Sequence, residues 1–196
     1  TRTRSSFEVA AERLSADVTN FTVSTSSVVK GESVQDTIAT LQAMKVDYVI
    51  VRHYNSGLPN VIARHTNASV INAGDGAHAH PSQALLDSFT IREMFPDIRG
   101  RRVLIVGDIL HSRVARSTSI LMKRLGMEVA YLGPGSLVPR TEYSGIPRFS
   151  DFNEAFAWKP DVIYLLRVQK ERQDAPFFPS AREYNKIYGV TEERLK

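Results

Sequence analysis

Basic side chains follow the ends of several predicted strands, and their chemical type indicates what they would bind. Arg52, Arg113 and Arg167 each lie beyond an apolar, β-branched run, namely 47–51, 102–106 and 161–166. Open parallel sheets bind ligands beyond the carboxyl ends of their strands. Guanidinium groups pair best with carboxylates and phosphates. The sequence therefore predicts a crevice for a small molecule with several negative charges.

Other polar segments each admit two interpretations. Residues 1–4, Thr-Arg-Thr-Arg, precede a predicted helix, where they would form either a phosphate cradle or an ordinary helix cap with solvated arginines. His78 and His80 could chelate zinc, but no third ligand has suitable spacing, so a polar cluster at a helix start is the better interpretation. In the small, polar loop 25–32, the basic Lys30 is either solvated or a ligand that reaches outward.

Composition and missing motifs exclude several classes of protein. The 196 residues include no cysteine, which rules out disulfides, thiolate metal sites and cysteine nucleophiles and agrees with a cytoplasmic protein. Only Gly107 stands where a dinucleotide-binding loop would carry G-x-G-x-x-G, and neither a Walker A nor a G-x-S-x-G motif occurs. No apolar run reaches the ~18 residues of a membrane span. The basic residues lie at separate strand ends, so nucleic acid is not an expected partner.

Alternating helical and strand patterns predict an α/β fold with two domains, each a mostly parallel sheet flanked by helices. A break at Pro96 to Gly100 divides the chain into domains over 1–95 and 96–196, with net charges of −1 and +5. The predicted helices are 5–14, a segment capped by Ser33 that runs to Met44, 57–65, 81–94 and 112–125; the predicted strands are 47–51, 68–71, 102–106, 128–132 and 161–166, with a loop-rich connection over 133–150.

Together these segments resemble the catalytic chain of the aspartate carbamoyltransferase family, in the family's order and across nearly the whole chain. The similar segments are Thr1-Arg-Thr-Arg-Ser-Ser-Phe-Glu8, Asn72-Ala-Gly-Asp-Gly76, His80-Pro-Ser-Gln-Ala-Leu-Leu-Asp87, Val106-Gly-Asp-Ile-Leu-His-Ser-Arg-Val-Ala-Arg-Ser117 and Leu166-Arg-Val-Gln-Lys-Glu-Arg172. Two positions depart from the family pattern: Tyr54 stands where proline is common, and Ser82 where threonine is common. The resemblance implies an aspartate/ornithine carbamoyltransferase-like fold, with a carbamoyl phosphate domain over 1–95 and an aspartate domain over 96–196.

The resemblance also implies which residues bind each substrate. Carbamoyl phosphate would be bound by Thr1, Arg2, Thr3, Arg52, His80 and Gln83, of which Arg2, Thr3, Arg52 and His80 would act in catalysis. L-Aspartate would be bound by Lys30, Arg113, Arg167 and Gln169. A serine, Ser26 or Ser27, and Lys30 would reach into the active site of a neighbouring subunit, because the family's catalytic unit is a homotrimer. No cofactor and no metal is implied.

The implied reaction transfers the carbamoyl group of carbamoyl phosphate to the amine of L-aspartate, a step of pyrimidine biosynthesis. The amine attacks the carbamoyl carbon, and the tetrahedral oxyanion expels phosphate as N-carbamoyl-L-aspartate forms. Catalysis would come from holding two anions in attack geometry and stabilising the developing charge. Arg52, Thr3 and His80 would polarise the carbonyl oxygen, while Arg2 would neutralise the departing phosphate.

The sequence also predicts that the chain is incomplete, and it leaves three alternative functions open. The chain starts at Thr1 and stops before the family's His-Pro-x-Pro loop, so we expect an interior piece of a longer polypeptide. The alternatives are an ornithine-type carbamoyltransferase, a non-catalytic carbamoyltransferase-like assembly domain and a nucleotide-binding Rossmann domain. An ornithine enzyme would need acidic surroundings, whereas Arg167-Val-Gln-Lys170 offers positive charge and an amide. Regulatory chains or a dihydroorotase as partners of the trimer are left open.

Overall fold

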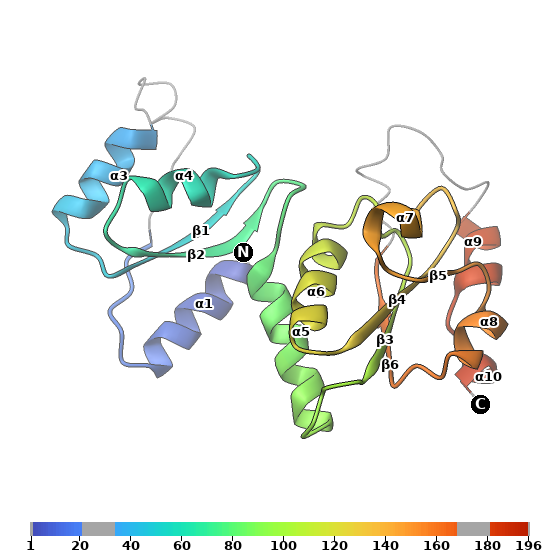
Figure 1. Ribbon diagram of the computed structural model, residues 1–196. Coiled ribbons are helices and arrows are strands. Elements are labelled where there is room, and N and C mark those ends of the chain that lie inside the picture. Colours follow the sequence, from blue (N-terminus) through green and yellow to red (C-terminus); the bar gives the residue numbers. More distant parts are fainter. Residues whose placement is uncertain (1, 21–33, 168–180, 196) are drawn as a thin grey trace. The chain divides into compact units, whose positions relative to one another are not determined.

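The computed structural model describes residues 2–20, 34–167 and 181–195 and divides them between two compact units (Figure 1). One unit comprises Thr1–Arg52 with Gly57–Ala73, and the other comprises His53–Ser56 with Gly74–Lys196. The described strands form a two-stranded sheet, β1-β2, and a four-stranded sheet with the order β5-β4-β3-β6. Within these described ranges, no helix has the length and apolar character needed to cross a membrane.

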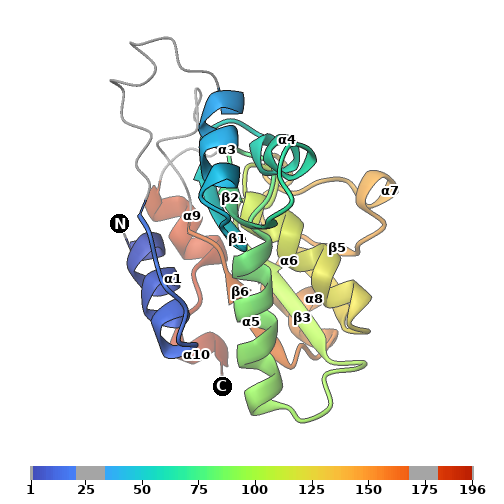
Figure 2. The same cartoon turned by 90° about the vertical axis from the view of Figure 1, so that its left-hand side faces the viewer.

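The first unit has a small core between two helices and a sheet. Its elements are α1 (Arg2–Arg13), α3 (Val34–Ala43), β1 (Tyr48–His53), α4 (Leu58–Arg64) and most of β2 (Ser69–Asp75). Ile38 of α3, Val51 of β1 and Ile62 of α4 form the buried cluster. In Figure 2, α3 and α4 lie beside the β1 and β2 ribbons, which agrees with this shared core.

Two elements of the first unit differ from the sequence prediction. Helix α1 begins at Arg2 rather than at residue 5, so Arg2, Thr3 and Arg4 lie in the first turn of the helix and not before it. The sequence pattern predicts a buried β1 that ends at Val51, but the strand runs to His53. Of the described β1 residues only Val51 is buried, and Tyr48 is 68% exposed, because the core of this unit covers little of the strand.

The second unit has helices on both faces of a parallel sheet. Its elements are α5 (Pro81–Met94), β3 (Arg102–Val106), α6 (Arg113–Arg124), β4 (Glu128–Leu132), α7 (Thr141–Ser144), β5 (Arg148–Phe149), α8 (Phe152–Ala157), β6 (Val162–Leu165), α9 (Ala181–Tyr188) and α10 (Glu192–Leu195). β3 pairs in parallel with β4 and β6, and β4 pairs in parallel with β5. The predicted parallel α/β architecture is therefore confirmed.

Alternate residues of β3 face opposite sides of this sheet, as the geometry of a strand requires. Val103 and Ile105 belong to a core with residues of α5 and α6. Leu104 and Val106 belong to a second core with Phe152 of α8. Figure 1 shows the same division, with α5 and α6 on one side of the sheet and α8 and α9 on the other. The continuous apolar run of β3 is explained by this double burial.

The compact units divide near residue 73, whereas the sequence pattern predicts a domain break near residue 95. α5 packs against α6, and its Ile91 belongs to the core that β3, β4 and α6 share. Burial of this helix face therefore joins residues 81–94 to the unit that follows. The functional domains 1–95 and 96–196 stay a prediction.

Leu104 anchors the second core at 0% exposure, whereas Leu165 on the neighbouring strand β6 is 58% exposed. We expect Leu104→Ala to lower the free energy of unfolding by about 2–5 kcal/mol, because it deletes buried methyl groups and leaves a cavity. Leu165→Ala, the matched control, should cost less than about 0.5 kcal/mol. Urea denaturation of the two variants measures both values, and equal losses would contradict the assigned core.

Candidate active site

A buried carboxylate closes the turn that follows β2. Asp75 is 0% exposed. One of its carboxylate oxygens, Oδ1, accepts a hydrogen bond from the backbone N–H of Ala79 at 3.0 Å, and the other, Oδ2, lies 3.0 Å from Nδ1 of His78. His80 follows as the N-cap residue of α5, whose first position is Pro81. The carboxylate of Asp75 thus stabilises a tight turn that places His80 at the start of α5.

Side chains from the first turns of α6 hold the same turn from the other side. Arg113 donates from Nη1 to the carbonyl oxygen of Gly76 at 2.6 Å. Arg116 donates to the next two carbonyl oxygens of the turn at 3.3 and 3.2 Å. The hydroxyl of Ser117 accepts from the backbone N–H of His80 at 2.9 Å. Helix positions three and four apart share a face, so one face of α6 satisfies successive backbone groups of this turn.

The side chains of Arg113 and His80 both adjoin Gly74. A Cβ atom placed on Gly74 would lie 3.2 Å from Nη2 of Arg113 and 3.3 Å from Cδ2 of His80. Gly74 also has φ = +116°, which disfavours any residue with a side chain. The backbone at Gly74 therefore permits a close approach of an arginine, which is only 8% exposed, and a histidine. The guanidinium of Arg113 and the imidazole of His80 thus both lie against this glycine.

A second buried carboxylate follows β3. Asp108 is 2% exposed, accepts from the backbone N–H of His111 at 3.2 Å and lies 2.8 Å from Nδ1 of the same histidine. Burial, with the nearby charges of Asp108 and Tyr188, raises the pKa of the Tyr184 phenol to about 12. Tyr184 on α9 therefore keeps its proton at neutral pH. The next residue after His111 is the N-cap of α6, whose hydroxyl accepts a backbone hydrogen bond.

Within the first unit, the structure joins two predicted ligands of carbamoyl phosphate. Arg52, near the end of β1, donates from Nη1 to the hydroxyl of Thr3 in the first turn of α1. Arg2 precedes Thr3 on the same helix and is exposed. This contact brings the end of a strand and the beginning of a helix together, which the sequence pattern alone did not predict.

The structure describes only some of the remaining predicted ligands. Gln83 lies in the first turn of α5, and its amide nitrogen donates to Asp87 at 2.9 Å. Arg167 is exposed and follows β6 at the sheet edge where β3 ends, since Leu166 donates its N–H to the carbonyl of Val106. The predicted residues that lie outside the described ranges are Thr1, Ser26, Ser27, Lys30 and Gln169.

Four polar residues that position the turns and ligands of this site were not among those predicted from the sequence: Asp75, Asp87, Asp108 and Arg116. Arg116 and Asp87 had a usable signal, because each stands three or four places from a predicted ligand on the same helix, Arg113 and Gln83. The two remaining carboxylates carried no signal, since their partners are backbone N–H groups and histidine side chains of the turns they close.

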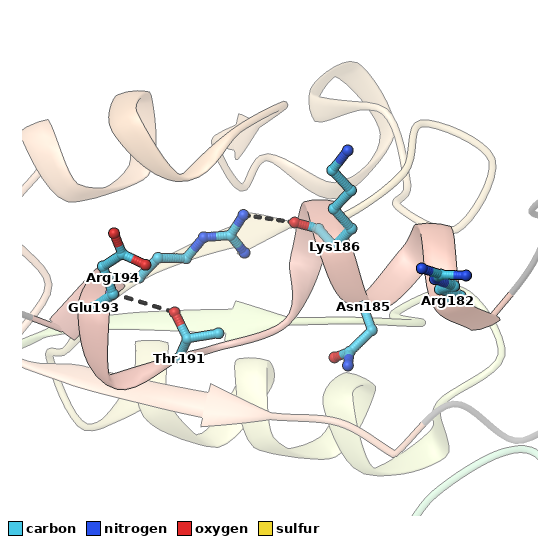
Figure 3. Close-up of a pocket in the computed structure, with 6 residues that line it drawn as sticks. All are labelled: Arg182, Asn185, Lys186, Thr191, Glu193 and Arg194. Carbon is cyan, nitrogen blue, oxygen red and sulfur yellow. Dashed lines mark hydrogen bonds between the residues drawn. The ribbon is translucent and has the colours of Figure 1, made fainter.

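A separate pocket of about 700 Å³ lies between α9 and α10 (Figure 3). Its lining residues are Arg182, Asn185, Lys186, Thr191, Glu193 and Arg194. Figure 3 shows the guanidinium of Arg194 reaching the carbonyl oxygen of Lys186, at 2.7 Å, and Arg194 also donates to Ile187 and Gly189. Arg194 thus caps the C-terminus of α9, where the helix dipole favours a cation. Of the predicted ligands that the structure describes, none lines this pocket.

Comparisons with known proteins agree with the predicted fold. Residues 1–93 match the family model "Aspartate/ornithine carbamoyltransferase, carbamoyl-P binding domain". The whole chain is 96% identical to the aspartate carbamoyltransferase catalytic subunit of Akkermansia muciniphila, covering 63% of it, and 56% identical to that of Endomicrobium trichonymphae, covering 62%. The chain therefore spans less than two thirds of the length of these relatives.

Solved structures of the same kind superpose on the chain. Aspartate transcarbamoylase from Trypanosoma cruzi in complex with carbamoyl phosphate matches with a TM-score of 0.79 and 30% identity, over 100% of this chain and 65% of the other. The complex of that enzyme with N-(phosphonacetyl)-L-aspartic acid matches with a TM-score of 0.75 and 33% identity, over 89% and 58%. The chain thus has the fold of the aspartate and ornithine carbamoyltransferases. More narrowly, the chain belongs to the aspartate carbamoyltransferase family.

We expect Gly74→Ala to destabilise the second unit more than Gly100→Ala does. Both glycines have positive φ, +116° and +73°, so each alanine carries backbone strain of about 1–3 kcal/mol. Only at Gly74 does the new methyl group also crowd Arg113 and His80, whereas nothing lies within 4 Å at Gly100. Chemical denaturation measures the difference; equal losses would show that the turn yields without cost.

Proposed function

We propose that this chain is part of an aspartate carbamoyltransferase that transfers the carbamoyl group of carbamoyl phosphate to L-aspartate. The observation that supports this most directly is the meeting of Arg113 and His80 at Gly74. The resemblance assigns Arg113 to a carboxylate of aspartate and His80 to carbamoyl phosphate. The relatives named above are aspartate carbamoyltransferases, and the structures that match were solved with carbamoyl phosphate or a phosphonacetyl-aspartate ligand.

The proposed chemistry uses charge and position rather than a covalent intermediate. The aspartate amine attacks the carbamoyl carbon, the carbonyl oxygen becomes an oxyanion, and the C–O bond to phosphate breaks. His80, Arg52 and Thr3 stabilise the oxyanion, and Arg2 neutralises the leaving phosphate, which accepts a proton from the amine. Such donors act best when they are already in place before the reaction. The contact between Arg52 and Thr3 supports a prearranged pair.

Arg113 and Arg167 take the two carboxylates of L-aspartate in this proposal, and Gln83 takes the carbamoyl end of carbamoyl phosphate. The guanidinium of Arg113 is held in place by the bond from Nη1 to the carbonyl oxygen of Gly76. A guanidinium oriented in this way presents its planar fork in a fixed direction, which suits bidentate recognition of a carboxylate. Thr1, Lys30 and Gln169 complete the proposed set of ligands.

The proposed enzyme is a cytoplasmic homotrimer in which Ser26 or Ser27 and Lys30 serve the active site of a neighbouring subunit. The resemblance supports the trimer, and the lack of cysteine agrees with a cytoplasmic protein. Pyrimidine biosynthesis is the pathway that the product would enter. The positive residue at Arg167 argues against ornithine as the acceptor, since the side chain of ornithine is itself a cation.

The test is the formation of N-carbamoyl-L-aspartate by the full-length gene product. We expect Arg167→Ala to raise the KM for L-aspartate by about 10- to 100-fold, because a charge-assisted contact to a carboxylate is lost. The KM for carbamoyl phosphate should stay within about twofold by the same reasoning. Arg113→Ala should act in the same direction.

Arg148→Ala is the matched control, since Arg148 is an exposed arginine at the edge strand β5. It should leave both KM values unchanged. Absence of carbamoyl-aspartate would favour a non-catalytic assembly domain, and carbamoylation of ornithine instead of aspartate would favour the ornithine type. A change in melting temperature with NAD or ATP but not with carbamoyl phosphate would favour the nucleotide-binding alternative.

A further inference from the structure

The carboxylate of Asp87 on α5 connects Gln83, a proposed ligand of carbamoyl phosphate, to strand β6. Asp87 stands four residues after Gln83, so the two side chains share one face of the helix. Gln83 donates from Nε2 to Oδ1 of Asp87 at 2.9 Å. Tyr164 of β6 donates from its hydroxyl to Oδ2 of the same carboxylate at 2.7 Å. Both oxygens of Asp87 thus have a donor, one from the helix and one from the strand.

This arrangement decides which way the amide of Gln83 faces. An ionised carboxylate only accepts hydrogen bonds, whereas an amide group can turn either its NH₂ or its oxygen toward a neighbour. Next to Asp87 the nitrogen must face the carboxylate, so Oε1 faces the opposite way. Burial raises the pKa of Tyr164, and the charge of Asp87 raises it further, so the phenol stays protonated and remains a donor to Asp87.

We infer that Asp87 and Tyr164 are positioning residues that make Gln83 an acceptor for the carbamoyl N–H of the substrate. The inference rests on the proposed function, in which Gln83 contacts carbamoyl phosphate. The carbamoyl group carries an NH₂ with two donors beside its carbonyl oxygen. The outward Oε1 of Gln83 complements such a donor, while a reversed amide would oppose N–H to N–H.

The consequence is a preference among acyl phosphates. Acetyl phosphate has the same phosphate and carbonyl as carbamoyl phosphate, but a methyl group replaces the NH₂. A site that accepts a hydrogen bond from the NH₂ favours carbamoyl phosphate, since the methyl leaves a polar oxygen without its partner. The orientation set by Asp87 thus determines part of the specificity for the carbamoyl donor.

The decisive variant is Asp87→Asn in the full-length protein. The introduced amide can accept from Tyr164 with its oxygen and donate to Oε1 of Gln83, which turns the amide nitrogen of Gln83 outward. The expected result is a rise of about tenfold in the KM for carbamoyl phosphate. The inhibition constant of acetyl phosphate, measured against carbamoyl phosphate, should change by less than about twofold because acetyl phosphate has no N–H to lose.

A compensating change separates orientation from general damage. Gln83→Glu in the Asp87→Asn background supplies a carboxylate that accepts from the introduced amide with one oxygen and presents the other oxygen outward. The added negative charge weakens both phosphates alike, so the relevant quantity is the ratio of the acetyl phosphate inhibition constant to the carbamoyl phosphate KM. We expect this ratio to return toward the wild-type value in the double variant.

Tyr164→Phe is the second, independent variant and keeps the inference testable if Asp87→Asn does not fold. Removal of one donor loosens the carboxylate, so the ratio should fall by about two- to threefold. Tyr143→Phe is the matched control, because Tyr143 is 84% exposed, and it should leave the ratio unchanged. An unchanged ratio in Tyr164→Phe would show that Tyr164 does not help to orient the amide of Gln83.

If Asp87→Asn changes the KM for carbamoyl phosphate and the inhibition constant of acetyl phosphate by the same factor, the inference is overturned and Asp87 has a structural role only. That outcome leaves the proposed function intact, because wild-type turnover is measured in the same experiment. Absence of carbamoyl-aspartate from the wild-type reaction would instead overturn the proposed function, and the inference with it.

Discussion

The hydrogen bonds between α6 and the turn at 76–80 are the constraint on which the rest of the site depends. A turn that follows a buried strand carries backbone carbonyl and N–H groups that need partners. Arg113, Arg116 and Ser117 supply those partners from one helix face. The position of His80 and the start of α5 follow from this contact, and α5 in turn carries Gln83 and Asp87. One face of α6 thereby determines the positions of His80 and of the residues that α5 carries.

Much of the fold could be predicted from the sequence, because its apolar runs and its helix-start residues give strong signals. The apolar runs of β3 and β4 and the Pro81 start of α5 were predicted at the bounds observed. α8 was missed because its six residues are too short for a clear period, although Asp151 accepts from the backbone of Glu154 as a capping pair does. The extension of β1 to His53 was missed since its exposed residues do not follow the expected burial pattern.

The strand-end arginines could be predicted as a group, but their individual surroundings could not. Position beyond a strand requires only the local pattern, whereas a contact such as Tyr164 with Asp87 joins residues far apart in the chain. Arginine itself is not diagnostic here. Arg113 and Arg194 both donate to backbone carbonyl oxygens, yet one is buried beside His80 and Gly74 and the other caps a short helix. The net positive charge of residues 96–196 thus includes arginines with a structural use as well as proposed ligands.

The carboxylates that close the turns after β2 and β3 also orient two imidazole rings. In each case Nδ1 of the histidine faces a buried aspartate, His78 with Asp75 and His111 with Asp108. A carboxylate there selects the tautomer with the hydrogen on Nδ1. The opposite nitrogen, Nε2, is then a lone-pair site in the neutral ring. Each turn therefore fixes the direction in which one imidazole ring presents its Nε2.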